Sequence, residues 1–208
     1  GGGTGDRSFD ITPIGTPRGV IVLIFGTGTA DQIVGVTADA IAMSEVTLSP
    51  ALAAAESNSH IYFLGSGIPN QTLTIAIDAG ASPYAAAAIT LTAGADTEVH
   101  DTSRSTTTAD DPSVVLTITS ASFCAGVLGS GDPNVPTAGT GTTMITSVDF
   151  GAATGGISRA SAIESANFTY GFVTPNSDDV ALLAVAITEI ATPSLLIRPN
   201  PMRVHLTQ

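Results

Sequence analysis

The stretch Gln71-Thr72-Leu73-Thr74-Ile75-Ala76-Ile77 places an apolar side chain at every second position from Leu73 onward. This alternation is typical of an extended strand, in which successive side chains point to opposite faces and one face is buried. The following residues, 78–84, include Gly80, Ser82 and Pro83, which favour a turn. A second apolar and Thr-containing run, Ala85–Thr92, comes next. The stretch therefore predicts two strands joined by a turn.

Runs of this kind recur along the chain, and nearly every one ends at Gly, Pro, Asn or Asp. Strands at this density, with few helical periods between them, predict an all-β fold, namely a two-sheet antiparallel sandwich that is jelly-roll-like. The runs are Gly19–Phe25, Ile33–Val36, Ala40–Leu48, His60–Leu64, Gln71–Ile77, Ala85–Thr92, Thr97–Asp101, Ser113–Thr119, Ser122–Leu128, Thr142–Phe150, Ile157–Ile163, Phe168–Val173 and Val180–Ile190.

Two segments carry residues that also favour a helix. Pro50–Glu56 begins with a proline, which suits a first helical position, and continues with alanines. For this segment a helical turn and an extended chain both stay open. Tyr84–Ala88 is alanine-rich, but it runs directly into Ile89-Thr90-Leu91-Thr92, so a strand is the stronger expectation there.

Both ends of the chain differ in composition from its middle. Residues 1–18 are rich in Gly and Pro, and we expect an extended N-terminal arm before a β-sandwich domain over residues 19–190. Residues 191–208 carry three prolines around an apolar run, and we expect a C-terminal arm or an edge strand. An arm of this kind lies along its own domain or along a neighbouring subunit. The Gly/Pro-rich stretch 129–141 is expected to be a long loop within the domain.

The charge balance excludes some classes of partner. The chain has 18 acidic residues against six basic ones and a formal net charge of −12. All six basic residues are arginines, at Arg7, Arg18, Arg104, Arg159, Arg198 and Arg203. Nucleic acid is an unfavourable partner, because binding a phosphate backbone needs clustered cations. The longest apolar runs are strand-length, so we expect no transmembrane helix and a soluble chain. The single cysteine, Cys124, excludes an internal disulfide.

No catalytic or cofactor motif is complete. Gly26-Thr27-Gly28 follows a strand-like run, but Asp31 stands where a dinucleotide fingerprint has its third glycine. The histidines His60, His100 and His205 match no metal-binding spacing. The acidic pairs 110–111, 178–179 and 96/98 leave calcium or carboxylate catalysis as alternatives, although such acids beside turn residues mostly bond their own backbone. We expect no cofactor and no metal.

The order of the runs resembles a family of β-sandwich virion proteins of tailed bacteriophages. The stretch Thr37-Ala38-Asp39-Ala40-Ile41-Ala42-Met43-Ser44 is similar to that family's "GGVAMT" strand, without the paired glycines. His60–Leu64, the turn 67–71 and Thr72–Ile77 are similar to its "Y-L-x-x-P-x-G-x-x-T-V-T-V" hairpin in a shifted, degenerate form. The resemblance covers residues 20–190 and implies a structural protein of the virion, which would assemble in the host cytoplasm.

We therefore expect a non-enzymatic capsid decoration or cement protein that binds the major capsid protein, and that forms a homo-oligomer, with a trimer as the expected state. The alternative is a carbohydrate- or surface-binding module of a tail fibre or an extracellular adhesin, with its site in 93–111 or 129–141. A third class, a sandwich-fold hydrolase, needs two carboxylates in one groove. The predicted partner-binding residues lie in the C-terminal segment: Leu195, Leu196, Ile197, Arg198 and Arg203.

Overall fold

The fold is seen in a computed structural model that describes residues 2–3, 5–28, 30–53, 57–131, 134–151, 153–175 and 178–190. Throughout these residues the regular structure is β-strand, and every pair of neighbouring strands is antiparallel. The predicted all-β antiparallel sandwich is confirmed. The described residues contain no helix that could cross a membrane.

Residues 2–92 form a first sandwich unit of two sheets. Inner sheet 1 has the order β1-β10-β3-β8-β6, with β7 also paired to β8, and outer sheet 1 has the order β2-β9-β4-β5. The strands are β1 (Gly2–Gly3), β2 (Arg7–Ile11), β3 (Pro17–Thr27), β4 (Ile33–Ala38), β5 (Ile41–Ala42), β6 (Ser44–Glu45), β7 (Ala51–Leu52), β8 (Ser57–Leu64), β9 (Leu73–Ala79) and β10 (Tyr84–Thr92).

Residues 97–190 form a second sandwich unit. Inner sheet 2 has the order β11-β19-β14-β17-β16, with β12 also paired to β19, and outer sheet 2 has the order β13-β18-β15. The strands are β11 (Thr97–Ser105), β12 (Thr108–Ala109), β13 (Ser113–Leu116), β14 (Ser122–Ser130), β15 (Thr137–Ala138), β16 (Thr142–Asp149), β17 (Thr154–Ala160), β18 (Phe168–Val173) and β19 (Asp178–Glu189).

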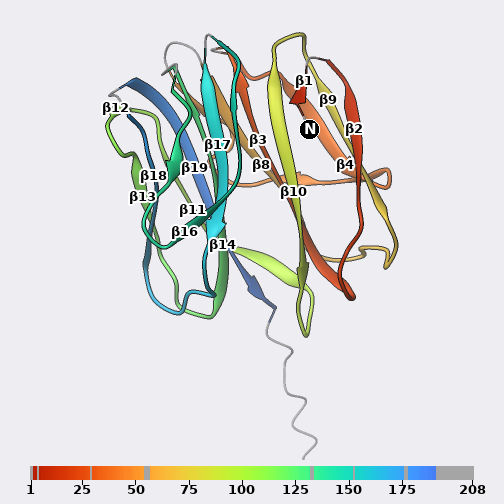
Figure 1. Cartoon of the computed structure of the whole chain (residues 1–208). Helices are drawn as coiled ribbons and strands as arrows, with labels where there is room; N and C mark the ends of the chain where they lie inside the picture. Colours follow the sequence, from red (N-terminus) through yellow and green to blue (C-terminus); the bar gives the residue numbers. More distant parts are fainter. Residues whose placement is uncertain are drawn as a thin grey trace, which may run out of the picture.

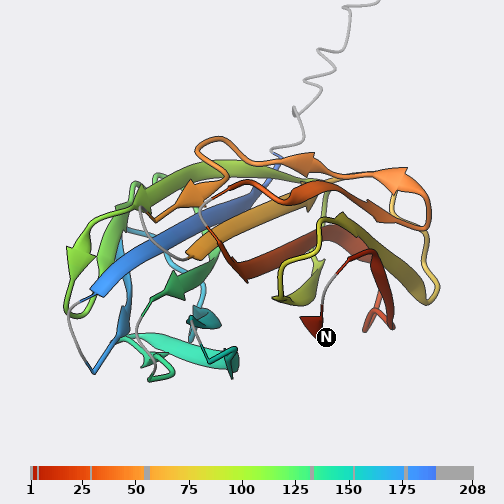
Figure 2. The same cartoon turned by 90° about the horizontal axis from the view of Figure 1, so that it is seen from above.

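The two units share one strand order. In inner sheet 1 the last strand of the unit, β10, is followed across the sheet by β3, β8 and β6. In inner sheet 2 the last strand, β19, is followed in the same way by β14, β17 and β16. In outer sheet 1, β9 lies between β2 and β4. In outer sheet 2, β18 lies between β13 and β15. Figures 1 and 2 show the first unit, coloured red to yellow, beside the second, coloured green to blue. The expected two-sheet sandwich is therefore present twice.

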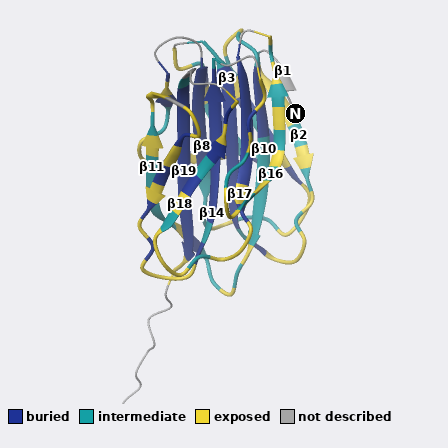
Figure 3. Cartoon of the chain, turned by 60° about the vertical axis from the view of Figure 1, so that its left-hand side comes forward, coloured by how far each residue is buried: buried dark blue, intermediate teal, exposed yellow. Residues whose placement is uncertain are grey.

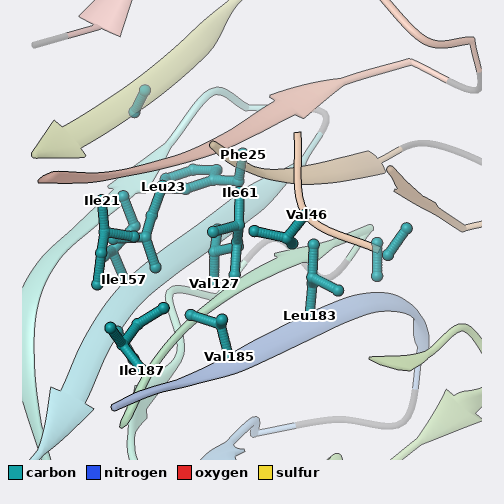
Figure 4. Close-up of a cluster of buried hydrophobic side chains, with 14 of the residues drawn as sticks. Ile21, Leu23, Phe25, Val46, Ile61, Val127, Ile157, Leu183, Val185 and Ile187 are labelled. Carbon is teal, nitrogen blue, oxygen red and sulfur yellow. The ribbon is translucent and has the colours of Figure 1, made fainter. Parts of the chain in front are cut away.

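The two inner sheets pack face to face around a shared core. Its buried side chains come from β3 and β8 on one side and from β14, β17 and β19 on the other. Figure 4 shows ten of them: Ile21, Leu23, Phe25, Val46, Ile61, Val127, Ile157, Leu183, Val185 and Ile187. Burying one such side chain stabilises the fold by about 1.5–3 kcal/mol, so this core holds the two units together.

Each unit has a second core between its inner and outer sheets. In the first unit Val20, Val22 and Ile24 of β3 pack against Leu73, Ile75 and Ile77 of β9 and their neighbours. In the second unit Val180, Leu182, Ala184 and Ala186 of β19 pack against the outer sheet, which contributes Leu116, Tyr170 and Phe172. The inner strands are therefore covered on both faces, and Figure 3 shows them as the most buried part of the molecule.

The structure decides several local predictions. Tyr84–Ala88 is part of strand β10, as preferred from the sequence, and within Pro50–Glu56, where a helical turn and an extended chain were both open, the described residues 51–52 form strand β7. The expected single strand Ala40–Leu48 is divided into β5 and β6, with positive φ at Asp39, Ala40 and Leu48 beside the breaks. In the expected N-terminal arm, β1 and β2 pair with β10 and β9, so the described part of the arm lies along its own domain.

Candidate functional site

The C-terminal candidates cannot be placed. Leu195, Leu196, Ile197, Arg198 and Arg203 lie outside the described residues, as does His205. Their role in partner binding stays a prediction.

The predicted acidic pairs are used to join loops. The Asp111 Oδ1 atom accepts a hydrogen bond from the Thr174 backbone N–H at 3.1 Å, and the Asp111 backbone N–H donates to Thr174 Oγ1 at 3.3 Å. The Thr108 hydroxyl donates to Asp179 Oδ1 at 2.6 Å. These bonds join residues that are far apart in the sequence, so they are not the bonds to an acid's own turn backbone that the sequence predicted.

The remaining residues considered as metal ligands also do not lie together. Asp96 pairs with Arg18 across 3.3 Å and lies just before strand β11, whereas Glu98 lies within β11. His100 Nε2 accepts a hydrogen bond from the Thr119 backbone N–H at 3.1 Å. Among the residues that the structure describes, no three His, Cys, Asp or Glu side chains are grouped as a metal ion would require.

Of the two segments expected to hold a carbohydrate site, 93–111 is largely strand, whereas the described part of 129–141 is strand only at its start and over two residues near its end. Residues 97–105 form β11 within the expected loop 93–111, and residues 129–130 and 137–138 belong to β14 and β15 within the expected loop 129–141. All ten aromatic residues lie in the described ranges, and each is buried or partly buried. Because sugar rings are usually held on exposed aromatic faces, the described surface has no such platform.

The best-formed polar site is a shallow groove of about 810 Å³ over outer sheet 1, which we call the acidic groove. Its carboxylates come from three places: Asp6 just before β2, Asp78 in β9 and Glu45 in β6. Arg7 lies at the same groove, and so does the exposed apolar side chain of Val34. Pairing of β2 and β4 with opposite edges of β9 brings these residues together.

Asp6 and Asp78 form a pair of exposed carboxyl groups in contact. The Asp6 Oδ1 atom accepts a hydrogen bond from the Ala79 backbone N–H at 3.1 Å, which fixes it beside β9. Partial desolvation, then the negative charge of Asp6 and a hydrogen bond between the two carboxyls, raise the pKa of Asp78. Two like charges in contact repel each other, so a cation placed beside them is favoured.

A buried imidazole lies next to the third carboxylate of the groove. His60 is fully buried, its Nδ1 lies 3.2 Å from Glu45 Oε1, and its Nε2 lies 3.9 Å from Asp31 Oδ1. Ser49 Oγ donates to the same Glu45 oxygen at 2.6 Å. Burial acts to raise the pKa of Glu45, but the hydrogen bonds with His60 and Ser49 outweigh it and lower that pKa.

This arrangement of carboxylates has the chemistry to hold a positive group. The contacting carboxyls of Asp6 and Asp78 are closer than the ~5–10 Å separation used by glycoside hydrolases, and both are exposed to water. His60 is enclosed between two carboxylates, where it joins β8 to β6 and to the loop before β4. The acidic groove therefore fits an Arg or Lys side chain of a partner.

No family model, no curated protein and no solved structure matches this chain.

The residues of the acidic groove were not found from the sequence. Asp6 lies in a segment expected to be an arm, and Asp78 was assigned only to a turn. Their contact depends on the pairing of β2 with β9, which joins residues 7–11 to residues 73–77. The sequence signal for a turn at this place was the glycine-containing stretch Gly3–Asp6. In the structure Gly5 has a φ of 66°, which glycine adopts readily, and this lets the chain turn into β2.

Proposed function

We propose that this chain is a non-enzymatic structural protein of a virus particle, most specifically a decoration or cement protein that binds the assembled shell of a tailed bacteriophage. The sequence resemblance gives the class of particle. The physical support comes from the double sandwich, in which four stacked sheets make a rigid body whose outer faces and edges are left for contacts.

The single observation that carries the proposal is the pair Asp6 and Asp78 at the acidic groove. Desolvation, then the negative charge of Asp6, raises the pKa of Asp78 in the free protein, and a partner cation would relieve the repulsion between the two carboxyls on binding. A capsid subunit that offers an Arg or Lys side chain has the required chemistry. The net charge of −12 adds long-range attraction toward a basic surface.

Stabilisation of the shell follows from mass action. A protein that binds the assembled shell but not its separate subunits stabilises the assembly by RT ln(1 + [L]/Kd) per site. An oligomer that contacts several shell subunits at once binds more tightly than its single contacts. Both effects need only a rigid contact surface and no chemical step.

Co-sedimentation of the purified chain with particles that lack it tests the proposal. We expect saturable binding that weakens as salt is raised, and we expect Asp78→Asn to weaken it several-fold. Glu98→Gln is the matched control, because it removes one negative charge from an exposed position on β11. Absence of saturable binding, or equal effects of the two variants, would contradict a shell contact through the acidic groove.

The carbohydrate-binding alternative has less support, because the ten aromatic side chains are all at least partly buried. A glycan array separates the two proposals. Saturable binding to any glycan, together with no binding to particles, would favour the adhesive module and contradict the decoration protein.

A further inference from the structure

The two inner sheets differ at one edge. In inner sheet 2, β19 is paired on both sides, with β14 along one edge and with β11 along residues 182–189 of the other. In inner sheet 1 the equivalent strand β10 pairs fully with β3, but its outer edge carries only β1, at Tyr84 and Ala85. Within the described ranges, no strand pairs with the outer edge of residues 87–92.

The free backbone groups of an unpaired edge offer a template to another strand, and β-proteins often cover such an edge with a further segment. Residues 87–91 of β10 are neither fully buried nor fully exposed on either face. Ile89 and Leu91 pack against the core shared by the two inner sheets, but only as partly buried side chains. One further strand along this edge would cover them.

A groove of about 940 Å³, which we call the crossover groove, leads to this edge. Its walls include Ile190, directly after β19, Ala121 before β14 and Ile163 after β17. They also include Ile89 and Leu91 of β10. Ile190 and Ile163 keep 42% and 60% of their surface exposed, so the groove has apolar walls that nothing in the described chain covers.

The link between β10 and β11 shows how a segment on such a path can lead to the edge of a sheet. The link 93–96 leaves β10, crosses the ends of the first unit's strands and delivers β11 to the edge of β19. On the way, the Thr97 backbone N–H donates to Gly65 O, after β8, at 3.0 Å, and the Thr97 hydroxyl donates to Arg18 O, in β3, at 2.7 Å. The crossover groove passes the corresponding ends of β14 and β17. The two paths meet where the Ile190 N–H donates to Asp96 O at 2.8 Å.

We propose that the C-terminal segment of the same chain follows the crossover groove and that residues Ser194–Arg198 add to the outer edge of β10 as an antiparallel strand. This strand would complete inner sheet 1 as β11 completes inner sheet 2. The inference is independent of the proposed function.

The spacing of the sequence fits this path. Four residues, 93–96, separate the end of β10 from the start of β11, and four residues, 190–193, separate the end of β19 from Ser194. Thr97 is paired with the last residue of β19, Glu189, so the equivalent register places Ser194 opposite Thr92. Pro193 and Pro199 bound the run, as expected of an edge strand, because proline cannot donate to the ladder.

The side chains fit the same register. If Ser194 pairs with Thr92, the same register would set Leu195 opposite Leu91 and Ile197 opposite Ile89. Residues directly opposite each other in an antiparallel pair share a face, so Leu195 and Ile197 would extend the shared core over its exposed rim. The apolar run at the C-terminus thereby gains a partner within its own chain.

Hydrogen exchange of the full chain tests the proposal, with a truncation after Ile190 and the variant Ile197→Asp compared with it. We expect backbone amides in 87–92 to exchange at least tenfold faster in both altered proteins. Leu206→Asp is the matched control, since it places the same charge in the tail outside the run, and it should exchange as the full chain does. Amides of β19, residues 180–187, report whether the truncated protein stays folded.

A synthetic peptide of residues 191–200 gives a second measurement. Added to the truncated protein, it should restore slow exchange in residues 87–92, and less so when it carries Asp at position 197. Equal exchange of these amides in the full and truncated chains would overturn the proposal. Slow exchange that is present only in a dimer, and lost on dilution to monomer, would also overturn it, because the strand would then come from a second copy.

Discussion

Substitution of Gly155 by alanine tests the packing of the two inner sheets. Gly155 lies in β17, and a Cβ atom built there would overlap three carbons of the Phe25 ring from the opposite sheet. Phe25 is fully buried and leans on Phe150 at a ring-centroid distance of 5.7 Å, so the ring has no open space to enter. Overpacking of this kind costs about 1–3 kcal/mol.

For a chain of this length, roughly 2–4 °C of melting temperature is lost per kcal/mol, so we expect Gly155→Ala to lower Tm by about 2–12 °C. Calorimetry or denaturant unfolding of the variant measures the loss. Gly35→Ala is the matched control, because a Cβ there meets no atom within 4 Å. We expect a change no larger than about 0.5 kcal/mol for this control.

A double-mutant cycle assigns the loss to the contact itself. Phe25→Leu alone leaves a space in the shared core and destabilises the protein, but it also makes room for a methyl group at position 155. The double variant should therefore lose at least about 0.5 kcal/mol less than the sum of the two single losses. Strict additivity, or a Gly155→Ala protein as stable as the parent, would refute the face-to-face packing of the inner sheets.

Three further predictions concern ionisable groups. Glu45→Gln should reduce the free energy of unfolding above pH 4.5 and have progressively less effect below it. The reason is that the interactions that lower the pKa of Glu45 stabilise the folded state only while Glu45 is charged. Urea unfolding across a range of pH measures this. Asp78→Asn should stabilise the protein at neutral pH, where the Asp78 charge is desolvated and repelled by that of Asp6. In the same assay the gain should fall as the pH drops through the raised pKa of Asp78 and should vanish below its ordinary value of 3.8. Burial, and then the negative charge of Glu164, raises the pKa of the Cys124 thiol to about 12. Cys124 should therefore resist iodoacetamide at pH 8 until the protein is unfolded, which mass spectrometry can follow.

The strands were predictable because their pattern is local. Alternation in Leu73–Ile77 identifies β9, which has one face on a core. The four-layer arrangement also had a signal, which the two-sheet prediction missed. Val20–Phe25 is apolar without alternation and is fully buried on both faces, as is Val180–Ala186 in the second unit. Continuous apolar strands of this kind are expected where sheets cover both sides.

The repeated strand order was not found, because only short fragments of sequence are shared between the units. Gly26-Thr27-Gly28 closes β3 as Gly129-Ser130-Gly131 closes β14, and Asn70-Gln71-Thr72 precedes β9 as Asn167-Phe168-Thr169 opens β18. Turn glycines and polar triplets are too common to indicate duplication alone. The acidic groove could not be predicted either, because the pairing that forms it, between β2 and β9, joins strands that are far apart in the sequence.

The central claim, a decoration protein of a virus particle, is tested most directly by the copy number of this chain in particles purified from its source. Quantitative mass spectrometry compares it with the most abundant shell protein. We expect a copy number close to that of the shell protein or a simple fraction of it set by the lattice symmetry. A few copies per particle, or none, would contradict it.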